Sequence, residues 1–162
     1  NGSYKYIEYF GRGPHENYWD RNTSAFINKY KSDIFKEYFP YISPQENGYK
    51  TDIRWLALTD NQKGLLFVGD SLLCFSALPF EQEKLYQSKR GTKHIPDVKF
   101  NDLTNLCIDY KQMGVGGDDS WGARTHEEYL LKNNNYFYRF AIIPINNVNQ
   151  INYYSKYFLY YK

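Results

Sequence analysis

The sequence predicts an all-β fold, an antiparallel sandwich, and two observations lead to that class. Aromatic residues make up 20% of the 162 residues, with 18 Tyr and 11 Phe, and these side chains favour strands. Short apolar or alternating runs recur along the chain, and turn-forming residues separate them. Many short strands with regular turns are typical of a sandwich. A chain of this length fits one domain and can bury a core.

The first half of the chain contains a clear hairpin. Residues 4–10 alternate aromatic or apolar side chains with charged ones and predict the first strand. Residues 22–42 have no clean period, so we expect a long wrapped loop with at most one short strand. The runs 52–58 and 65–68 flank the polar turn 59–64, which ends in glycine, and this is a hairpin signature.

Further strands are expected in the second half. A third run, 72–78, ends at a proline, and residues 81–88 have the composition of a short surface helix with Leu85 facing inward. Residues 106–111 alternate and lead into a glycine-rich loop. A second hairpin is expected from 127–131 and 136–145, around the turn at 133–135.

The glycine-rich loop is the most informative local feature, because residues 116–121 read Gly-Gly-Asp-Asp-Ser-Trp. Glycines permit a sharp turn, and short polar side chains can bond to nearby backbone and fix it. Trp121 either folds back as a loop anchor or presents a flat face to an uncharged ligand, of which a sugar is the leading candidate. The expected loop-shaping residues are Gly116, Gly117, Asp118, Asp119 and Ser120.

Three ordered motifs carry a resemblance to a known family. They read GRGPHENYWDR at 11–21, SPQENG at 43–48 and GVGGDDSW at 114–121. The trio resembles the C-terminal region (small chain, domain 5) of the β-galactosidases of glycoside hydrolase family two. That resemblance implies an antiparallel super-sandwich similar to galactose mutarotase, of which this chain holds only the C-terminal half. Residues 1–145 would form the domain, and the Tyr- and Asn-rich tail 146–162 departs from the family as an extra edge strand or a sticky appendage.

The resemblance also implies that the catalytic residues lie on another part of the parent enzyme. In the family a separate (β/α)₈ barrel carries the two catalytic glutamates, and the parent enzyme holds Mg and Na elsewhere. None of those segments occurs here, so we expect this chain to have no catalytic residue, no cofactor and no activity by itself. Trp121 would reach the sugar site of a parent that hydrolyses terminal β-D-galactosides such as lactose. The implied partners are the galactoside, the barrel domain and, through the sandwich face, other subunits.

The first motif has mainly a structural interpretation. Arginines and carboxylates in it can form charge-assisted hydrogen bonds, with Arg binding carboxylate through two donors. We expect one structural network, consisting of Arg12, Glu16, Asp20 and Arg21. It would hold the loops in register.

Composition excludes several classes of function. The net charge is only +2 and the charges are mixed, so nothing favours a nucleic-acid partner. No apolar run approaches the roughly 20 residues that span a bilayer, so no membrane partner is expected. The three histidines lie in separate segments without zinc-ligand spacing, which predicts no metal site. Cys74 and Cys107 could pair or stay as free thiols, and two buried thiols are favoured because both residues sit in apolar, strand-like runs. The compartment stays open between bacterial cytoplasm and periplasm.

Two rival functions remain at this stage. A stand-alone carbohydrate-binding module would use Trp121 and nearby tyrosines as a stacking platform and need no barrel. A mutarotase-like epimerase would use His94 or His126 with Glu127 or Glu128 as acid and base. A catalytic role for Asp118 and Asp119 is disfavoured, since adjacent residues on a tight turn usually diverge.

Overall fold

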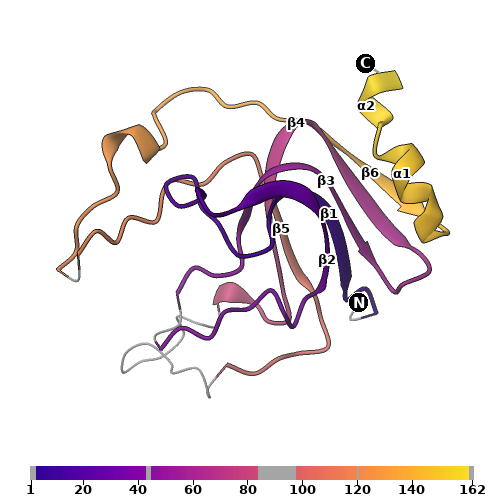
Figure 1. The fold of residues 1–162 in the computed structure, drawn as a ribbon, viewed down its shortest axis with the longest axis horizontal. Helices are drawn as coiled ribbons and strands as arrows, with labels where there is room; N and C mark the ends of the chain where they lie inside the picture. The colour runs from indigo at the N-terminus through magenta and orange to yellow at the C-terminus, as the bar shows by residue number, and fades with distance from the viewer. Residues whose placement is uncertain (1–2, 43–44, 84–97, 120, 161–162) are drawn as a thin grey trace.

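The computed structural model describes residues 3–42, 45–83, 98–119 and 121–160. These residues build a six-stranded antiparallel sheet in the order β2-β1-β3-β4-β5, with β6 also paired to β4 (Figure 1). The strands are β1 (Tyr6–Gly13), β2 (Phe26–Asp33), β3 (Lys50–Thr59), β4 (Gly64–Leu78), β5 (Asn105–Asp109) and β6 (Phe140–Ile145). Helical turns are η3 (Glu127–Tyr129), η4 (Val148–Gln150), α1 (Ile151–Tyr154) and α2 (Tyr157–Tyr160). The predicted all-β, antiparallel class is confirmed.

The hairpin predicted around 59–64 is confirmed and forms the centre of the sheet. Thr59 of β3 pairs with Gly64 of β4, and the Asp60 carboxylate accepts hydrogen bonds of 2.9 Å from the backbone N–H groups of Gln62 and Lys63. These bonds use the local side-chain chemistry typical of turns. The strands predicted at 4–10 and 106–111 are also present, as β1 and β5.

Strand β4 is longer than the sequence predicts. The runs 65–68 and 72–78, expected as separate strands, belong to one continuous strand. Its first part pairs with β6 and its second part with β5. The exposed residues 70–72 mark the change of partner. The Gly-Asp-Ser sequence at 69–71 is what made the two runs look separate.

Strand β2 corrects the expectation of a long loop. It pairs with β1 along its full length, yet most of its side chains are exposed. A strand without a buried face does not need apolar and polar side chains at alternate positions. Its sequence therefore lacks the period-2 pattern by which strands are recognised.

The second predicted hairpin is also wrong. Residues 127–129 form the 3₁₀ turn η3, and β6 pairs with β4 instead of with the 127–131 segment. Most of the helix predicted over 81–88, including Leu85, lies outside the described residues.

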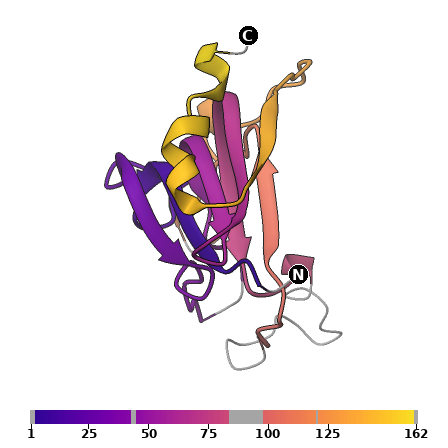
Figure 2. The same cartoon turned by 90° about the vertical axis from the view of Figure 1, so that its right-hand side faces the viewer.

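Apolar layers cover both faces of the sheet. One cluster is made by Ile7, Tyr9, Ile34, Ile53, Leu56, Leu58, Phe67, Leu73, Phe75 and Ala77. On the opposite face lie Trp55, Ala57, Leu66, Val68, Ile145 and Ile151. The last of these belongs to the C-terminal tail, which is helical and packed on the sheet (Figure 2). The tail is therefore neither of the two forms expected for it. In the described parts of the chain, no helix is both long and apolar enough to span a bilayer.

A buried ion pair ties the loop after β2 to the central strand β3. Lys50 and Glu37 are 1% and 6% exposed, and the Lys50 ammonium donates to the Glu37 carboxylate. Lys50 also donates to the backbone oxygen of Gly48 at 3.4 Å. Removing one member would leave the other charge buried without compensation, which is the costly way to break such a pair.

We therefore expect Lys50→Met to lower the free energy of unfolding by about 3–5 kcal/mol, measured by urea denaturation. Lys36→Met is the matched control, because Lys36 pairs with Asp33 at 3.1 Å on the surface with its side chain 76% exposed, and it should cost less than about 1 kcal/mol. Adding Glu37→Leu to Lys50→Met should recover much of the loss. Equal effects for the two lysine variants would contradict this assignment.

Candidate functional site

The segment between β5 and β6 extends away from the sheet (Figure 1), and part of it folds on itself. We call residues 114–125 the tryptophan loop. The Asp119 carboxylate accepts hydrogen bonds from the backbone N–H groups of Trp121, at 2.8 Å, and Ala123, at 3.1 Å. The Thr125 hydroxyl donates to the backbone oxygen of Gly114 at 2.8 Å, so the two ends of the loop are joined.

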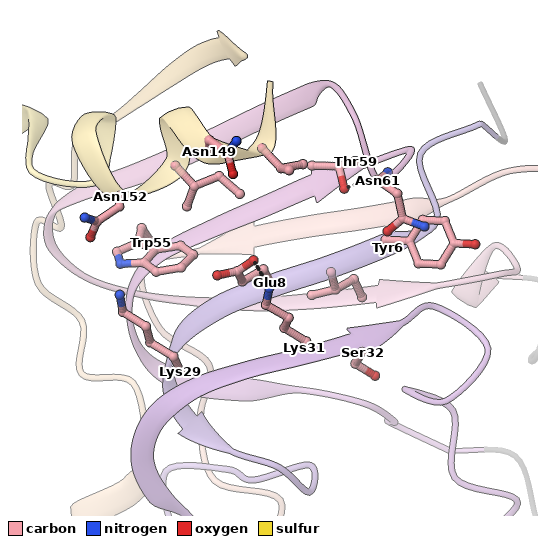
Figure 3. Close-up of a pocket in the computed structure, with 13 residues that line it drawn as sticks. Tyr6, Glu8, Lys29, Lys31, Ser32, Trp55, Thr59, Asn61, Asn149 and Asn152 are labelled. Carbon is pink, nitrogen blue, oxygen red and sulfur yellow. Dashed lines mark hydrogen bonds and ion pairs between the residues drawn. The ribbon is translucent and has the colours of Figure 1, made fainter. Parts of the chain in front are cut away.

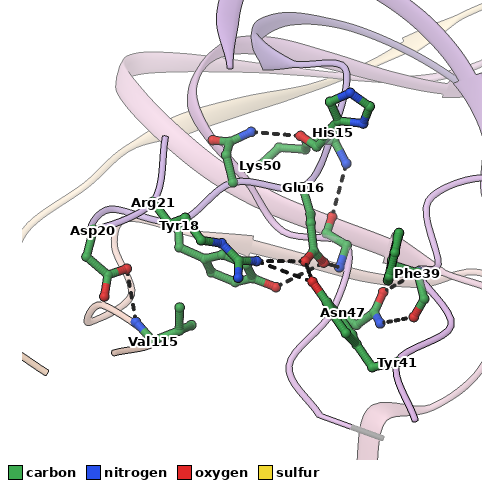
Figure 4. Close-up of polar contacts among 12 residues, drawn as sticks. His15, Glu16, Tyr18, Asp20, Arg21, Phe39, Tyr41, Asn47, Lys50 and Val115 are labelled. Carbon is green, nitrogen blue, oxygen red and sulfur yellow. Dashed lines mark hydrogen bonds and ion pairs between the residues drawn. The ribbon is translucent and has the colours of Figure 1, made fainter. Parts of the chain in front are cut away.

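Asp20 anchors the tryptophan loop from the first motif. Its two carboxylate oxygens accept hydrogen bonds from the backbone N–H groups of Val115, at 3.1 Å, and Gly116, at 2.8 Å. A Cβ at Gly114 would lie 2.5 Å from one of those oxygens, so glycine is required for this approach. Figure 4 shows Asp20 facing Val115 across the gap between two distant segments.

A pair of aromatic contacts supports the base of the loop. The Lys111 ammonium lies 3.4 Å from the centre of the Trp19 ring, and the Tyr129 ring meets Trp19 edge-on at 5.9 Å. The Gly114 N–H donates to the Tyr129 backbone oxygen at 2.9 Å. The two chain segments that flank the loop are thus held against Trp19, the neighbour of Asp20.

The Trp121 side chain is 94% exposed. It is therefore not folded back as a loop anchor. Gly117 and Gly122, on either side of it, have φ values of 95° and 93°, in the region that favours glycine. The loop combines a hydrogen-bonded backbone with an indole that the described residues leave uncovered. Ser120 lies outside those residues.

Asp118 pairs with His126 across the loop. The His126 Nε2 and an Asp118 carboxylate oxygen are in hydrogen-bond contact, and both side chains are more than half exposed. The hydrogen bond to Asp118, followed by the charges of Asp118, Glu128 and Asp20, raises the pKa of His126. His126 thus contacts Asp118 rather than the adjacent glutamates that an epimerase would need. His94 lies outside the described residues.

Glu16 is the centre of the first motif (Figure 4). Its carboxylate accepts from the Arg21 guanidinium at 2.8 Å, from the Gly48 N–H at 2.9 Å and from the hydroxyls of Tyr18 and Tyr41. The Arg21 guanidinium also lies 5.2 Å from the centre of the Tyr18 ring. A carboxylate with this many donors fixes the 16–21 turn, from which Asp20 projects.

The four residues expected in one network divide into three groups. Glu16 and Arg21 bind each other, and Asp20 binds the tryptophan loop. Arg12 instead binds Asp52 at 2.5 Å and the Ala25 backbone oxygen at 2.9 Å. Asp52 sits at an irregularity in β3 with a φ of 55°, and a bulge of this kind re-aims a side chain.

Two buried asparagines of the motifs were not predicted as site residues. Asn17, 1% exposed, donates to the backbone oxygens of Arg12 and His15 and accepts from both the N–H and the hydroxyl of Thr51. Asn47, also 1% exposed, bonds the N–H and the oxygen of Phe39. Both stand inside the quoted motifs, next to a glutamate, and that position was the available signal.

No cluster of three or more His, Cys, Asp or Glu suitable for a metal ion occurs among the residues that the structure describes. Cys74 and Cys107 are free thiols, the first buried and the second half-buried. Burial raises the pKa of the Cys74 thiol to about 11, so it stays protonated near neutral pH.

Comparison with known proteins places the sequence of this chain in a family. Residues 1–142 match the family described as the β-galactosidase small chain. The chain is 40% identical to a β-galactosidase of Priestia megaterium over 147 residues, which are 90% of this chain and 14% of that protein. It is 38% identical to one from Pseudoalteromonas haloplanktis, over 84% of this chain and 12% of the relative. A Streptococcus thermophilus β-galactosidase is 34% identical over 86% of this chain and 14% of its own length. The chain thus spans only 12–14% of the length of these relatives.

The contact between His126 and Asp118 predicts a measurable titration. We expect the His126 imidazole to titrate above its ordinary pKa of 6.5, and Asp118→Asn to bring it back towards that value. Because the folded-state pKa is raised, the charged contact is complete below the ordinary pKa and is lost as pH rises through the raised one. NMR of the histidine ring signals follows both forms.

Glu128→Gln is the control for this titration, because Glu128 influences the His126 pKa less than Asp118 does. It should move the midpoint by a smaller amount. A His126 midpoint that does not respond to Asp118→Asn would show that the two side chains are not in contact.

Proposed function

This chain belongs to the family of the β-galactosidase small chain, and from that premise we propose that it is a non-catalytic part of a β-galactosidase. In this proposal its tryptophan loop forms one wall of a sugar site whose reacting groups stand on another part of the enzyme. The substrate is a terminal β-D-galactoside such as lactose.

The observation that carries the proposal is an uncovered indole on a fixed loop. Trp121 is 94% exposed, whereas a Trp kept only for packing is normally well buried. Its backbone is held by Asp119, and the loop is held by Asp20, so little conformational freedom would be lost on binding. The apolar C–H face of a pyranose stacks on such a ring, and a contact of this kind is worth about 1 kcal/mol.

The acidic residues of the loop support a structural role. A retaining glycosidase needs two carboxyl groups about 5–5.5 Å apart that are free to act as nucleophile and acid/base. Asp118 is occupied by His126, and Asp119 by two backbone N–H groups. The proposal therefore assigns bond cleavage to residues outside this chain.

The same exposed indole would also serve a stand-alone carbohydrate-binding module, which is the second candidate. The two differ in what the isolated chain does. A module binds galactose or lactose by itself, and saturable quenching of Trp fluorescence on titration would show it. A chain that supplies one wall of a shared site gives no saturable signal with these sugars.

In a full-length β-galactosidase that carries this chain, we expect Trp121→Ala to raise KM for lactose by roughly 5-fold, which corresponds to about 1 kcal/mol of lost stacking. The value of kcat should change less, because the indole binds the sugar and takes no part in cleavage. Steady-state kinetics with lactose measures both constants.

Phe137→Ala is the matched control, since Phe137 is another exposed aromatic, 82% accessible, outside the tryptophan loop. It should leave both constants near their original values. An unchanged KM in Trp121→Ala, or the same change in both variants, would refute the role proposed for Trp121.

A further inference from the structure

A cavity of about 440 Å³ lies between strands β1 to β3 and the C-terminal segment 146–158. We call this segment the helical tail; it contains η4, α1 and the start of α2, and it follows the residues matched by the family, which end at 142. In Figure 1 the helical tail and the segment that carries the tryptophan loop lie on opposite sides of the sheet. The cavity is therefore separate from the proposed sugar site, and its volume is within the range of small-molecule pockets.

The sheet side of the cavity carries three charged groups, two of which neutralise each other (Figure 3). Glu8 of β1 and Lys31 of β2 stand opposite each other in the sheet and bind at 3.2 Å. Lys29 lies two positions from Lys31 and so shares its face of the strand, and its ammonium lies 5.8 Å from the centre of the Trp55 ring. Among the residues that the structure describes, no carboxylate pairs with Lys29. The lining therefore has one uncompensated positive charge.

The helical tail presents side-chain amides to the same cavity. Asn149 and Asn152 are three positions apart, so they share one side of the helical turns, and Figure 3 shows both at the border of the cavity. In the described part of the chain, neither of the two side-chain amides takes part in a hydrogen bond. Each asparagine amide has two N–H donors. The tail thus adds unused donors to the uncompensated charge of Lys29.

Local contacts hold the amide-bearing part of the tail in place. The Gln150 side-chain oxygen accepts from the N–H groups of Asn146 and Asn147, and Asn147 accepts from the Asn149 N–H at 2.8 Å. This is a reciprocal capping box. Ile151, in the next turn, is 4% exposed and belongs to the buried cluster of the sheet. The wall is thus formed before any ligand binds, which lowers the cost of ordering on binding.

The remainder of the lining includes apolar side chains. Val148 and Ile151 of the tail and Trp55 of β3 all line the cavity, and all three belong to the apolar layer on this face of the sheet. A ligand that fits this cavity therefore combines a charged or polar group with an apolar part.

We propose that this cavity binds a small organic carboxylate. One ammonium and nearby amide N–H groups can satisfy a single negative charge through charge-assisted hydrogen bonds, and the apolar side chains can contact the rest of the molecule. A dianion such as phosphate would meet the Glu8 carboxylate with only one uncompensated cation to balance it. An uncharged ligand would leave Lys29 without a partner. The inference does not rest on the function proposed for Trp121.

The test uses benzoate as the probe and benzamide, which has nearly the same shape without the charge, as its control. Each is titrated into the isotope-labelled chain and followed by two-dimensional NMR. Benzoate should give saturable shifts of the Trp55 indole N–H and of the side-chain amides of Asn149 and Asn152. Benzamide should bind about 5-fold more weakly, which is the effect of losing one partly exposed charge contact.

Two lysine variants assign the preference to one residue. Lys29→Gln keeps a long polar side chain without the charge, and it should remove the preference for benzoate over benzamide. Lys156→Gln is the matched control, because Lys156 is exposed in the same tail and does not line the cavity; it should keep the preference. Lys29 is itself exposed on β2, so both variants should retain the spectrum of the folded chain.

Several results would overturn the proposal. They are the absence of saturable benzoate shifts at these groups, equal binding of benzoate and benzamide, and tighter binding of inorganic phosphate than of benzoate. A preference that survives in Lys29→Gln, or that is lost in Lys156→Gln, would overturn it as well. Saturation-transfer NMR with benzoate then extends the test to a full-length β-galactosidase that carries this chain. A signal that Lys29→Gln removes would support a free ligand, whereas no signal would overturn the proposal, because another part of the enzyme would fill the cavity.

Discussion

The carboxylate of Asp20 connects the folded body of this chain to the loop that carries Trp121, the most exposed aromatic residue among those that the structure describes. It accepts two backbone hydrogen bonds from residues 115 and 116, about 95 positions away in the sequence. Asp20 is itself fixed, because Tyr18 and Arg21 on either side of it bond to each other through both backbone groups, and Glu16 holds both of their side chains. A continuous series of bonds therefore runs from the sheet to Trp121. Hydrogen bonds with one charged partner are the strong members of their class, which suits an anchor at the surface.

The charged groups of the chain differ in how much they contribute to the stability of the fold. Both members of the Lys50–Glu37 pair are buried, so loss of either one leaves an uncompensated buried charge and lowers stability. Glu16 is also largely buried, although its partner Arg21 is exposed, and its loss would leave the Gly48 N–H and the Tyr18 hydroxyl without this acceptor. The Asp118–His126 contact is open to solvent, where ion pairs are worth little, and its consequence is a local sensitivity to pH. The buried groups therefore stabilise the fold, whereas the exposed Asp118–His126 contact makes the tryptophan loop sensitive to pH.

The sequence predicted the features whose signals are local. The hairpin at 59–64 and strands β1 and β5 were found because turn residues and alternation are contained within a few positions. Strand β2 was expected as no more than one short strand in a loop, because its side chains are mostly exposed. The helical form of the tail was not expected, because its apolar residues are explained only by the sheet face that they cover. The partners of Arg12 and Asp20 lie 40 and 95 residues away. Grouping the two with Glu16 and Arg21 by proximity in sequence therefore gave one network where the structure has three sets of contacts.

In the proposed function, Asp20 positions Trp121 for a sugar. A double-mutant cycle in the full-length enzyme tests it most directly, with lactose binding measured for Asp20→Ala, Trp121→Ala and the combination. If Asp20 acts through the indole, its removal should weaken binding when Trp121 is present and have almost no further effect when Trp121 is absent. Losses that simply add would contradict the claim, because they would show that the two residues affect binding independently.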